Sequence, residues 1–192
     1  MTSHSYLFLT SPRQGRVSWP ALLHGWLPVV VLLSLFAVES TPMLGADHTS
    51  SLLRHFTHAV TGAHASIDTH WSMIHHLIRK TGHFLGYGML SLAWLRALLM
   101  QLGHGRSRAN WRKMDGMWRL QVAAIALTFA VAGLDELHQS FLPNRTGTFS
   151  DVLLDTAGAL SLQMILRLAG YLARIFEAER AIYTTPAETA AA

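Results

Sequence analysis

Cysteine is absent from this chain of 192 residues, and charged residues make up only 14% of it. The first absence excludes disulfides, thiolate metal sites, a cysteine nucleophile and a bacterial lipoprotein anchor. The charged fraction is well below the roughly 25% that is typical of soluble domains. Hydrophobic residues account for 51% of the chain and gather in runs. This combination indicates an integral membrane protein.

Repeats and heptads are also absent, and no Ala-x-Ala cleavage pattern follows the first hydrophobic run. We therefore predict that this run is an uncleaved membrane span and not a signal peptide. The net charge of +4 comes from basic residues scattered around the hydrophobic runs. This distribution indicates that the basic residues set the orientation of the chain in the membrane and do not bind nucleic acid. No nucleic acid is therefore expected as a partner.

Four hydrophobic segments are expected to cross the bilayer, which takes about 20 residues in a helix. The expected spans are 17–38, 81–102, 120–139 and 151–170. The predicted fold class is an all-α membrane protein, a bundle of four transmembrane helices with an amphipathic helical segment at about 50–78 between the first two. We predict an N-terminal tail at 1–16, a four-span domain at 17–180 and a disordered Ala-rich tail at 181–192.

Lysine and arginine set the expected orientation. The N-terminal tail, the 103–119 loop and the C-terminal end hold ten of them, against four in the other two loops. By the positive-inside rule, both termini face the cytoplasm. The amphipathic segment then lies on the outer side, divided at Gly62, either in the membrane interface or over the bundle as a lid.

The third hydrophobic segment becomes polar before it is long enough to span. Fifteen uncharged residues, starting at Leu120, are followed by a polar group in the last turns of the expected span: Asp135, Glu136, His138 and Gln139. Ionisable residues at that depth are costly and by default indicate function. By the same topology, this group faces the outer leaflet.

Helical spacing places further polar residues on single faces of the spans. These sets are Lys80, His83, Tyr87 and Ser91; Thr128, Asp135, His138 and Gln139; and Asp151, Asp155 and Gly158. Lipid cannot satisfy such faces, so we expect them to pack inward. Close helix approach is expected at two small-residue pairs, Gly82 with Gly86 and Ala157 with Ser161. The candidate ligand-binding residues are Lys80, His83, Tyr87, Asp135, Glu136, His138, Gln139, Arg145, Asp151 and Asp155.

Other interpretations of this group stay open. It could be a structural network in which Lys80 or Arg145 neutralises a carboxylate and clamps the helices together. Asp135-x-x-His138 has the spacing of metal ligands, but di-iron bundles repeat such a motif on two helices, so neither a metal nor a cofactor is expected. No Gly-x-Ser-x-Gly elbow surrounds Ser140, which argues against serine chemistry.

Three ordered motifs follow one another on successive spans: Lys80-x-x-His83-Phe84-x-x-Tyr87, Asp135-Glu136-x-His138-Gln139-x-Phe141-x-Pro143-x-Arg145-x-Gly147, and Asp151-Val152-x-x-Asp155-x-x-Gly158. Together they resemble the VanZ-like family of bacterial integral membrane proteins. The resemblance implies a multi-pass protein of the bacterial plasma membrane. It also implies a possible link to resistance against teicoplanin, a glycopeptide that acts outside the cell. Asp155 departs from the family pattern, in which asparagine is usual.

The leading hypothesis is a cell-envelope protein without identifiable catalytic motif, which engages a polar or phosphate-bearing lipid or cell-wall precursor. Lys80 and Arg145 would meet phosphate in an outer-leaflet pocket. The rival is an intramembrane enzyme acting on lipid-phosphate head groups. In it His138 or His83 would be the acid and base, oriented by Asp135 or Glu136.

A transporter is the third class. It would need polar residues deep in the inner leaflet, and Arg96, which can reach the head groups, is the single one expected there. The oligomeric state is left open by the sequence.

Overall fold

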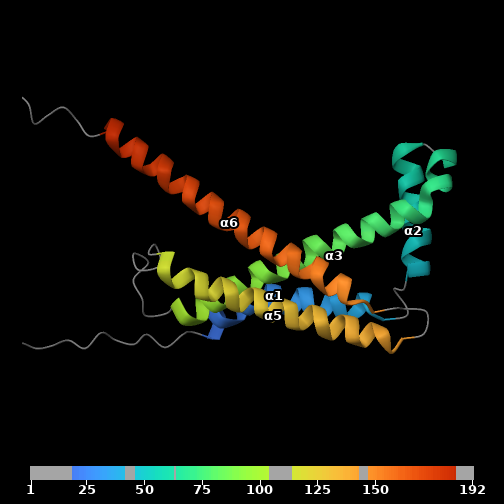
Figure 1. Cartoon of the computed structure of the whole chain (residues 1–192), viewed down its shortest axis with the longest axis horizontal. Coiled ribbons are helices and arrows are strands. Elements are labelled where there is room, and N and C mark those ends of the chain that lie inside the picture. Colours follow the sequence, from blue (N-terminus) through green and yellow to red (C-terminus); the bar gives the residue numbers. More distant parts are fainter. Residues whose placement is uncertain (1–18, 42–45, 63, 104–113, 143–146, 185–192) are drawn as a thin grey trace, which may run out of the picture.

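The computed structural model describes residues 19–41, 46–62, 64–103, 114–142 and 147–184. Within these ranges the chain forms five helices and no strand, which confirms the predicted all-α class there. The helices, labelled in Figure 1, are α1 (Trp19–Glu39), α2 (Ala46–Thr61), α3 (His64–Gly103), α5 (Met114–Ser140) and α6 (Phe149–Thr184).

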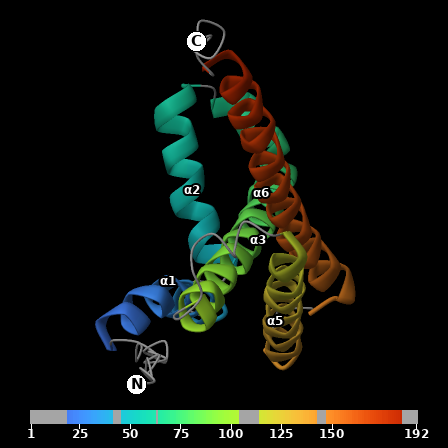
Figure 2. The same cartoon turned by 90° about the vertical axis from the view of Figure 1, so that its left-hand side faces the viewer.

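Helix α3 is central, because it packs against each of the other four helices. Helix α6 also packs against α5, and it crosses the other helices obliquely in Figure 1 before its C-terminal end projects away from them. Figure 2 shows α1 and α5 on opposite sides of α3. The core between these helices is made of Val29, Tyr87, Leu90, Ala93, Ala97, Ala132 and Val152. Its three alanines allow the helices to lie close together.

Helices α3 and α6 approach each other closely at Gly158. A Cβ added to Gly158 would lie 2.0 Å from the Phe84 carbonyl oxygen, and one added to Gly88 would lie 3.0 Å from the Gly158 carbonyl oxygen. The two backbones therefore touch, and no side chain fits at Gly158. The predicted pair Gly82 and Gly86 does not make this contact: a Cβ on Gly82 would meet nothing, and one on Gly86 would meet an aromatic ring of α1.

The segment predicted to be amphipathic, 50–78, forms parts of two helices. Helix α2 ends at Thr61, and Gly62 follows with φ of 64°, a conformation that glycine adopts readily. The expected division at Gly62 is therefore present. Helix α3 then runs unbroken from His64 to Gly103, so no break separates the amphipathic segment from the predicted second span. Polar residues near position 80 do not interrupt backbone hydrogen bonds, and the helix continues through them.

Helices α2 and α3 form a short antiparallel hairpin at the right of Figure 1. An ion pair joins them, with Arg54 Nη2 2.5 Å from Asp68 Oδ1, and His58 Nε2 lies 3.1 Å from the same oxygen. Trp71 Nε1 donates to Ser50 Oγ at 2.7 Å. The Arg54 guanidinium holds the pKa of Asp68 below its ordinary value.

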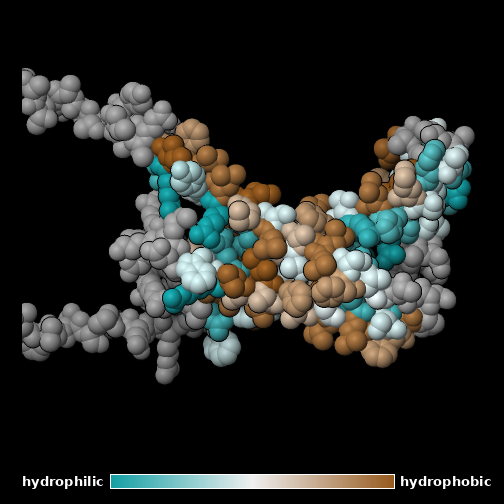
Figure 3. Space-filling view, viewed as in Figure 1, coloured by the Kyte–Doolittle hydropathy of each residue, from teal (hydrophilic) through white to brown (hydrophobic). Residues whose placement is uncertain are grey.

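Two stretches of the described helices are long and apolar enough to cross a membrane, Met117–Ser140 and Phe149–Glu177. Leu23–Glu39 is a shorter apolar helix. Large apolar side chains on these helices point outward, among them Leu35, Phe129 and Ile165. In Figure 3, apolar residues cover much of the middle of the visible face, and polar residues gather toward its two sides. This surface suits a lipid environment.

The ends of the chain differ from the prediction in one respect. The tail predicted at 1–16 lies outside the described residues, as do residues 185–192 of the predicted C-terminal tail. Helix α6, however, continues to Thr184, so residues 181–184 are helical and not part of a disordered tail.

Candidate functional site

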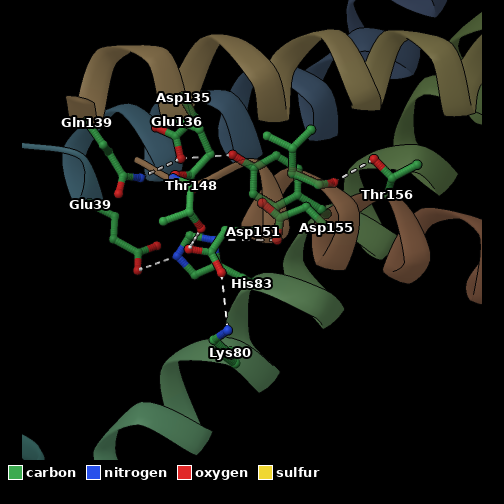
Figure 4. A network of polar contacts seen from close by, with 12 residues as sticks. Glu39, Lys80, His83, Asp135, Glu136, Gln139, Thr148, Asp151, Asp155 and Thr156 are labelled. Atoms are coloured by element: carbon green, nitrogen blue, oxygen red, sulfur yellow. Dashed lines mark hydrogen bonds and ion pairs between the residues drawn. The ribbon is translucent and has the colours of Figure 1, made fainter. Parts of the chain in front are cut away.

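A polar cluster forms where the end of α1, the middle of α3, the end of α5 and the start of α6 meet (Figure 4). Each of these four helices contributes at least one ionisable or hydrogen-bonding side chain. The cluster is the centre of the candidate site. It consists of three groups of contacts, around His83, around Asp135 and at the start of α6.

His83 of α3 lies between two carboxylates. Its Nδ1 is 3.5 Å from Asp155 Oδ1 on α6, and its Nε2 is 3.7 Å from Glu39 Oε1 on α1. Asp155 is 0% exposed, and neither of its oxygens accepts a hydrogen bond from a described residue. A buried carboxylate normally requires a charged or hydrogen-bonding partner. His83, 3.5 Å away, is placed to be that partner.

Asp135 of α5 accepts hydrogen bonds from three other segments or turns. The Tyr87 hydroxyl on α3 and the Gln139 amide one turn along α5 each donate to Oδ2 at 3.0 Å. The Ser40 hydroxyl, directly after α1, donates to Oδ1. Three donors satisfy this carboxylate, and they tie α1, α3 and α5 together. Asp135 is therefore placed as a structural junction.

The start of α6 is held by a second set of contacts. The Thr148 hydroxyl donates to Asp151 Oδ2 at 2.8 Å, and the Thr148 carbonyl oxygen accepts from the Asp151 N–H at 3.0 Å. The Thr148 backbone N–H donates to Glu136 Oε2 of α5 at 2.9 Å. Lys80 Nζ of α3 is 3.3 Å from Asp151 Oδ1. Thr148, directly before α6, therefore joins α5 to α6.

Beside these contacts lies a cavity with about 410 Å³ of empty space, part of it open to the surroundings. It is lined by His76, Arg79, Lys80, His83, Glu136, Gln139, Asp151 and Leu154. Because the cavity is partly open, a polar group of a ligand can enter it from outside. Both signs of charge face it, with cations on α3 and carboxylates on α5 and α6.

Most of the residues proposed from the sequence come together here. Those in the cluster or the cavity wall are Lys80, His83, Tyr87, Asp135, Glu136, Gln139, Asp151 and Asp155. His138 does not join them: its side chain is exposed on α5 and does not line the cavity. Arg145 lies outside the described residues.

Sequence reasoning missed five contributors: Glu39, Ser40, His76, Arg79 and Thr148. Glu39 and Ser40 are the first polar residues after the first hydrophobic run, so the topology that was expected could have pointed to them. Arg79 and His76 precede Lys80 by one and four positions on the same helix. Their spacing could have been recognised as an extension of the polar stripe.

A second polar network joins α3, α5 and α6 away from the cavity. Gln163 Nε2 donates to Ser91 Oγ at 2.9 Å and to its carbonyl oxygen at 3.1 Å, and Gln121 Nε2 lies 3.5 Å from the Gln163 carbonyl oxygen. Arg167 Nη1 is 3.5 Å from Gln121 Oε1. Both glutamines are buried. The sequence analysis did not single out these two glutamines, because they are uncharged and lie inside apolar runs.

No group of three or more His, Asp and Glu side chains able to hold a metal ion occurs in the part of the chain that the structure describes. Asp135 is held by hydroxyl and amide donors, and His138 is exposed.

Comparison with known proteins identifies the family. The family model described as VanZ/LLP1 matches residues 21–170, which includes α1, the cluster and the cavity. Searches of curated proteins and of solved structures find no match to the chain. The match covers most of the sequence and agrees with the three motifs that line the cluster. This membrane protein therefore belongs to the VanZ/LLP1 family.

Proposed function

We propose that this protein is a multi-pass protein of the bacterial plasma membrane with four spans, formed by α1, the C-terminal part of α3, α5 and α6. Both termini face the cytoplasm in this topology, and the polar cluster faces the outer leaflet. The distribution of lysine and arginine supports the orientation. Helix packing supports the bundle, because α3 contacts α1, α5 and α6.

The proposed function is to engage the head group of a polar or phosphate-bearing lipid, or of a lipid-linked cell-wall precursor. The observation that carries it is the cavity at the end of the apolar helices. Arg79 and Lys80 line this partly open cavity together with Glu136 and Gln139. Lipid molecules diffuse to such a position without leaving the membrane. Arginine and lysine are the usual partners of phosphate in proteins.

A link to glycopeptide resistance of the teicoplanin type belongs to this proposal. Such a drug acts outside the cell on wall precursors, and a protein that binds their head groups would alter their supply or accessibility. The family membership supports this link.

Native mass spectrometry of the detergent-extracted protein tests lipid engagement. The wild-type protein is expected to retain phospholipid, and Arg79→Gln or Lys80→Gln should lower the retained amount about tenfold through loss of a charge-assisted contact. Arg119→Gln is the matched control, because Arg119 is exposed on α5 and does not line the cavity. Equal lipid content in all four proteins would overturn the proposal.

The second candidate function is an intramembrane enzyme acting on lipid-phosphate head groups. One observation favours it: His83 lines the cavity and has Asp155 behind it at 3.5 Å, an arrangement suited to an oriented acid and base. His138 is no longer the better candidate, because it is exposed away from the cavity.

Incubation with labelled lipid phosphates separates the two functions. An enzyme would show turnover that His83→Gln abolishes and His138→Gln leaves unchanged. Absence of turnover by the wild-type protein over a broad lipid panel would reject the enzyme and leave the binding protein.

A further inference from the structure

The cavity has two chemically different ends. One turn of α3 supplies its cationic side with His76, Arg79 and Lys80. Helix α5 supplies its acceptor side with Glu136 and Gln139, which are three positions apart and therefore on one face. A ligand that fills the cavity must meet both sides at once.

On the cationic side, Arg79 is the group that is available to a ligand. Lys80 is already 3.3 Å from Asp151. Arg79, by contrast, has no carboxylate within ion-pair distance among the described residues, although its side chain lines the cavity. An unpaired guanidinium beside apolar helices favours a phosphate, which it can bind through two parallel hydrogen bonds.

On the acceptor side, two oxygens face the cavity without a donor from the described residues. Glu136 uses Oε2 to accept from the Thr148 N–H, which leaves Oε1. Gln139 uses its amide nitrogen to donate to Asp135, which leaves the amide oxygen Oε1. Both side chains belong to residues only 6% exposed. They form a small set of acceptors that an N–H group can satisfy.

Carboxylates near the acceptor side also favour a ligand group that donates N–H and carries positive charge. Asp135 and Asp155 lie in the same cluster, and the Asp155 oxygens receive no hydrogen bond from the described residues. Four carboxylates, including Glu136 and Asp151, are thus near this side of the cavity, whereas its cations lie on α3. A second anionic group placed here would be repelled, and a primary ammonium would be attracted.

We propose that the cavity recognises an aminoalkyl phosphodiester, the zwitterionic head-group chemistry of phosphoethanolamine. The phosphate meets Arg79 and His76, and the primary ammonium donates to Glu136 Oε1 and Gln139 Oε1. This inference rests on the proposed function, because it names the class of head group that the same cavity takes. A quaternary ammonium has no N–H to donate, and a glycerol head group carries no positive charge, so both fit less well.

The experiment compares head groups on the intact protein. Wild-type protein is placed in nanodiscs of equal parts phosphatidylethanolamine, phosphatidylglycerol and phosphatidylcholine, extracted, and its bound lipid is measured by native mass spectrometry. Retention of the ethanolamine lipid is expected to exceed retention of the other two about tenfold. A soluble arm adds glycerophosphoethanolamine or inorganic phosphate as competitor and shows whether the chain accepts the free head group.

Two variants test the two ends separately. Glu136→Gln keeps an acceptor for the Thr148 N–H but removes the charge, and it should bring the ethanolamine lipid to parity with the choline lipid. Arg79→Gln should lower the retention of all three lipids together, because each contains phosphate. Arg174→Gln, on the part of α6 beyond the cluster, is expected to behave as wild type.

The outcomes separate this inference from the function on which it rests. Equal retention of all three lipids by the wild-type protein would overturn the zwitterion proposal and leave lipid binding standing. Retention of none of them would overturn the proposed function itself. An unchanged ethanolamine preference in Glu136→Gln would also contradict the assignment of the ammonium to α5.

Discussion

Tyr87 joins three helices through one side chain. It is 0% exposed, its ring stacks on Phe36 of α1 with centroids 4.5 Å apart, and its hydroxyl donates to Asp135 of α5 at 3.0 Å. The ring contact would survive removal of the hydroxyl, and the hydrogen bond would not. Position 87 therefore allows packing and hydrogen bonding to be measured separately.

Tyr87→Phe is expected to lower the free energy of unfolding by about 1–3 kcal/mol, because Asp135 loses one of its donors in a buried site. Tyr171→Phe serves as the control, since Tyr171 is 55% exposed on α6. Thermal or denaturant unfolding of the detergent-solubilised proteins measures both. If the two variants were equally stable, the hydrogen bond to Asp135 would not contribute.

The sequence predicted most residues of the cluster and failed at His138 for a geometric reason. Residues on a helix are about 100° apart, so Glu136 and Gln139 lie about 100° and 40° to one side of Asp135. His138 lies about 60° to the other side, at the edge of the buried face. Residue spacing shows which side chains share a face of α5, but it does not show which of them lies at the middle of the buried face. That depends on how α5 is rotated about its axis against α3.

At the level of elements, the α2–α3 hairpin depends on an exposed ion pair. Arg54 and Asp68 join two helices whose other described contacts include the hydrogen bond from Trp71 to Ser50. Arg54 lowers the pKa of Asp68. A carboxyl whose pKa is lower in the folded state contributes stability above its unfolded pKa, and it loses this contribution as the pH falls toward the folded value.

The docking of α2 onto α3 is therefore expected to weaken as the pH falls below about 4, where an unfolded aspartate takes up its proton. Hydrogen exchange of the α2 amides at pH 6 and pH 3.5 measures this. Asp68→Asn should make the protection of α2 low at both values. A pH effect of equal size in Asp68→Asn would assign the change to another group.

Element boundaries could be predicted where the backbone itself demands a residue type. Gly62, with its positive φ, ends α2 at the predicted place. The unbroken course of α3 and the extension of α6 to Thr184 could not be predicted from hydropathy. Hydropathy reports where lipid begins and ends, and a helix can continue into water when its own hydrogen bonds are satisfied.

For the whole molecule, the orientation in the membrane decides on which side the cavity lies. Because the natural chain has no cysteine, single cysteines can be introduced and labelled without background. Asn144→Cys, between α5 and α6 in the sequence, should react with an impermeant maleimide from outside the cell. Ser107→Cys, between α3 and α5 in the sequence, should react only after the membrane is opened. The reverse pattern would place the cavity at the cytoplasmic side and contradict the outer-leaflet proposal.

The convergence of polar residues from the second, third and fourth predicted spans could be anticipated from orientation alone, and the structure brings them together. The expected topology places Glu39 and Ser40 on the same side, but their contacts with His83 and Asp135 depend on how α1 packs in the bundle. The direct contact of α3 and α6 backbones at Gly158 was equally hidden. The sequence contains several glycines with similar spacing. Only the point at which two helices cross decides which glycine allows their backbones to touch.

The link between Glu136 and Thr148 has a consequence for biogenesis. Only eight residues separate Ser140 at the end of α5 from Phe149 at the start of α6, and the Thr148 N–H already donates to Glu136 across this loop. The two helices can therefore enter the bilayer as a preformed hairpin, with the cap of the second satisfied by the first. During synthesis α3 emerges earlier, so Lys80 and Tyr87 meet their carboxylate partners, Asp151 and Asp135, only after this hairpin has been made.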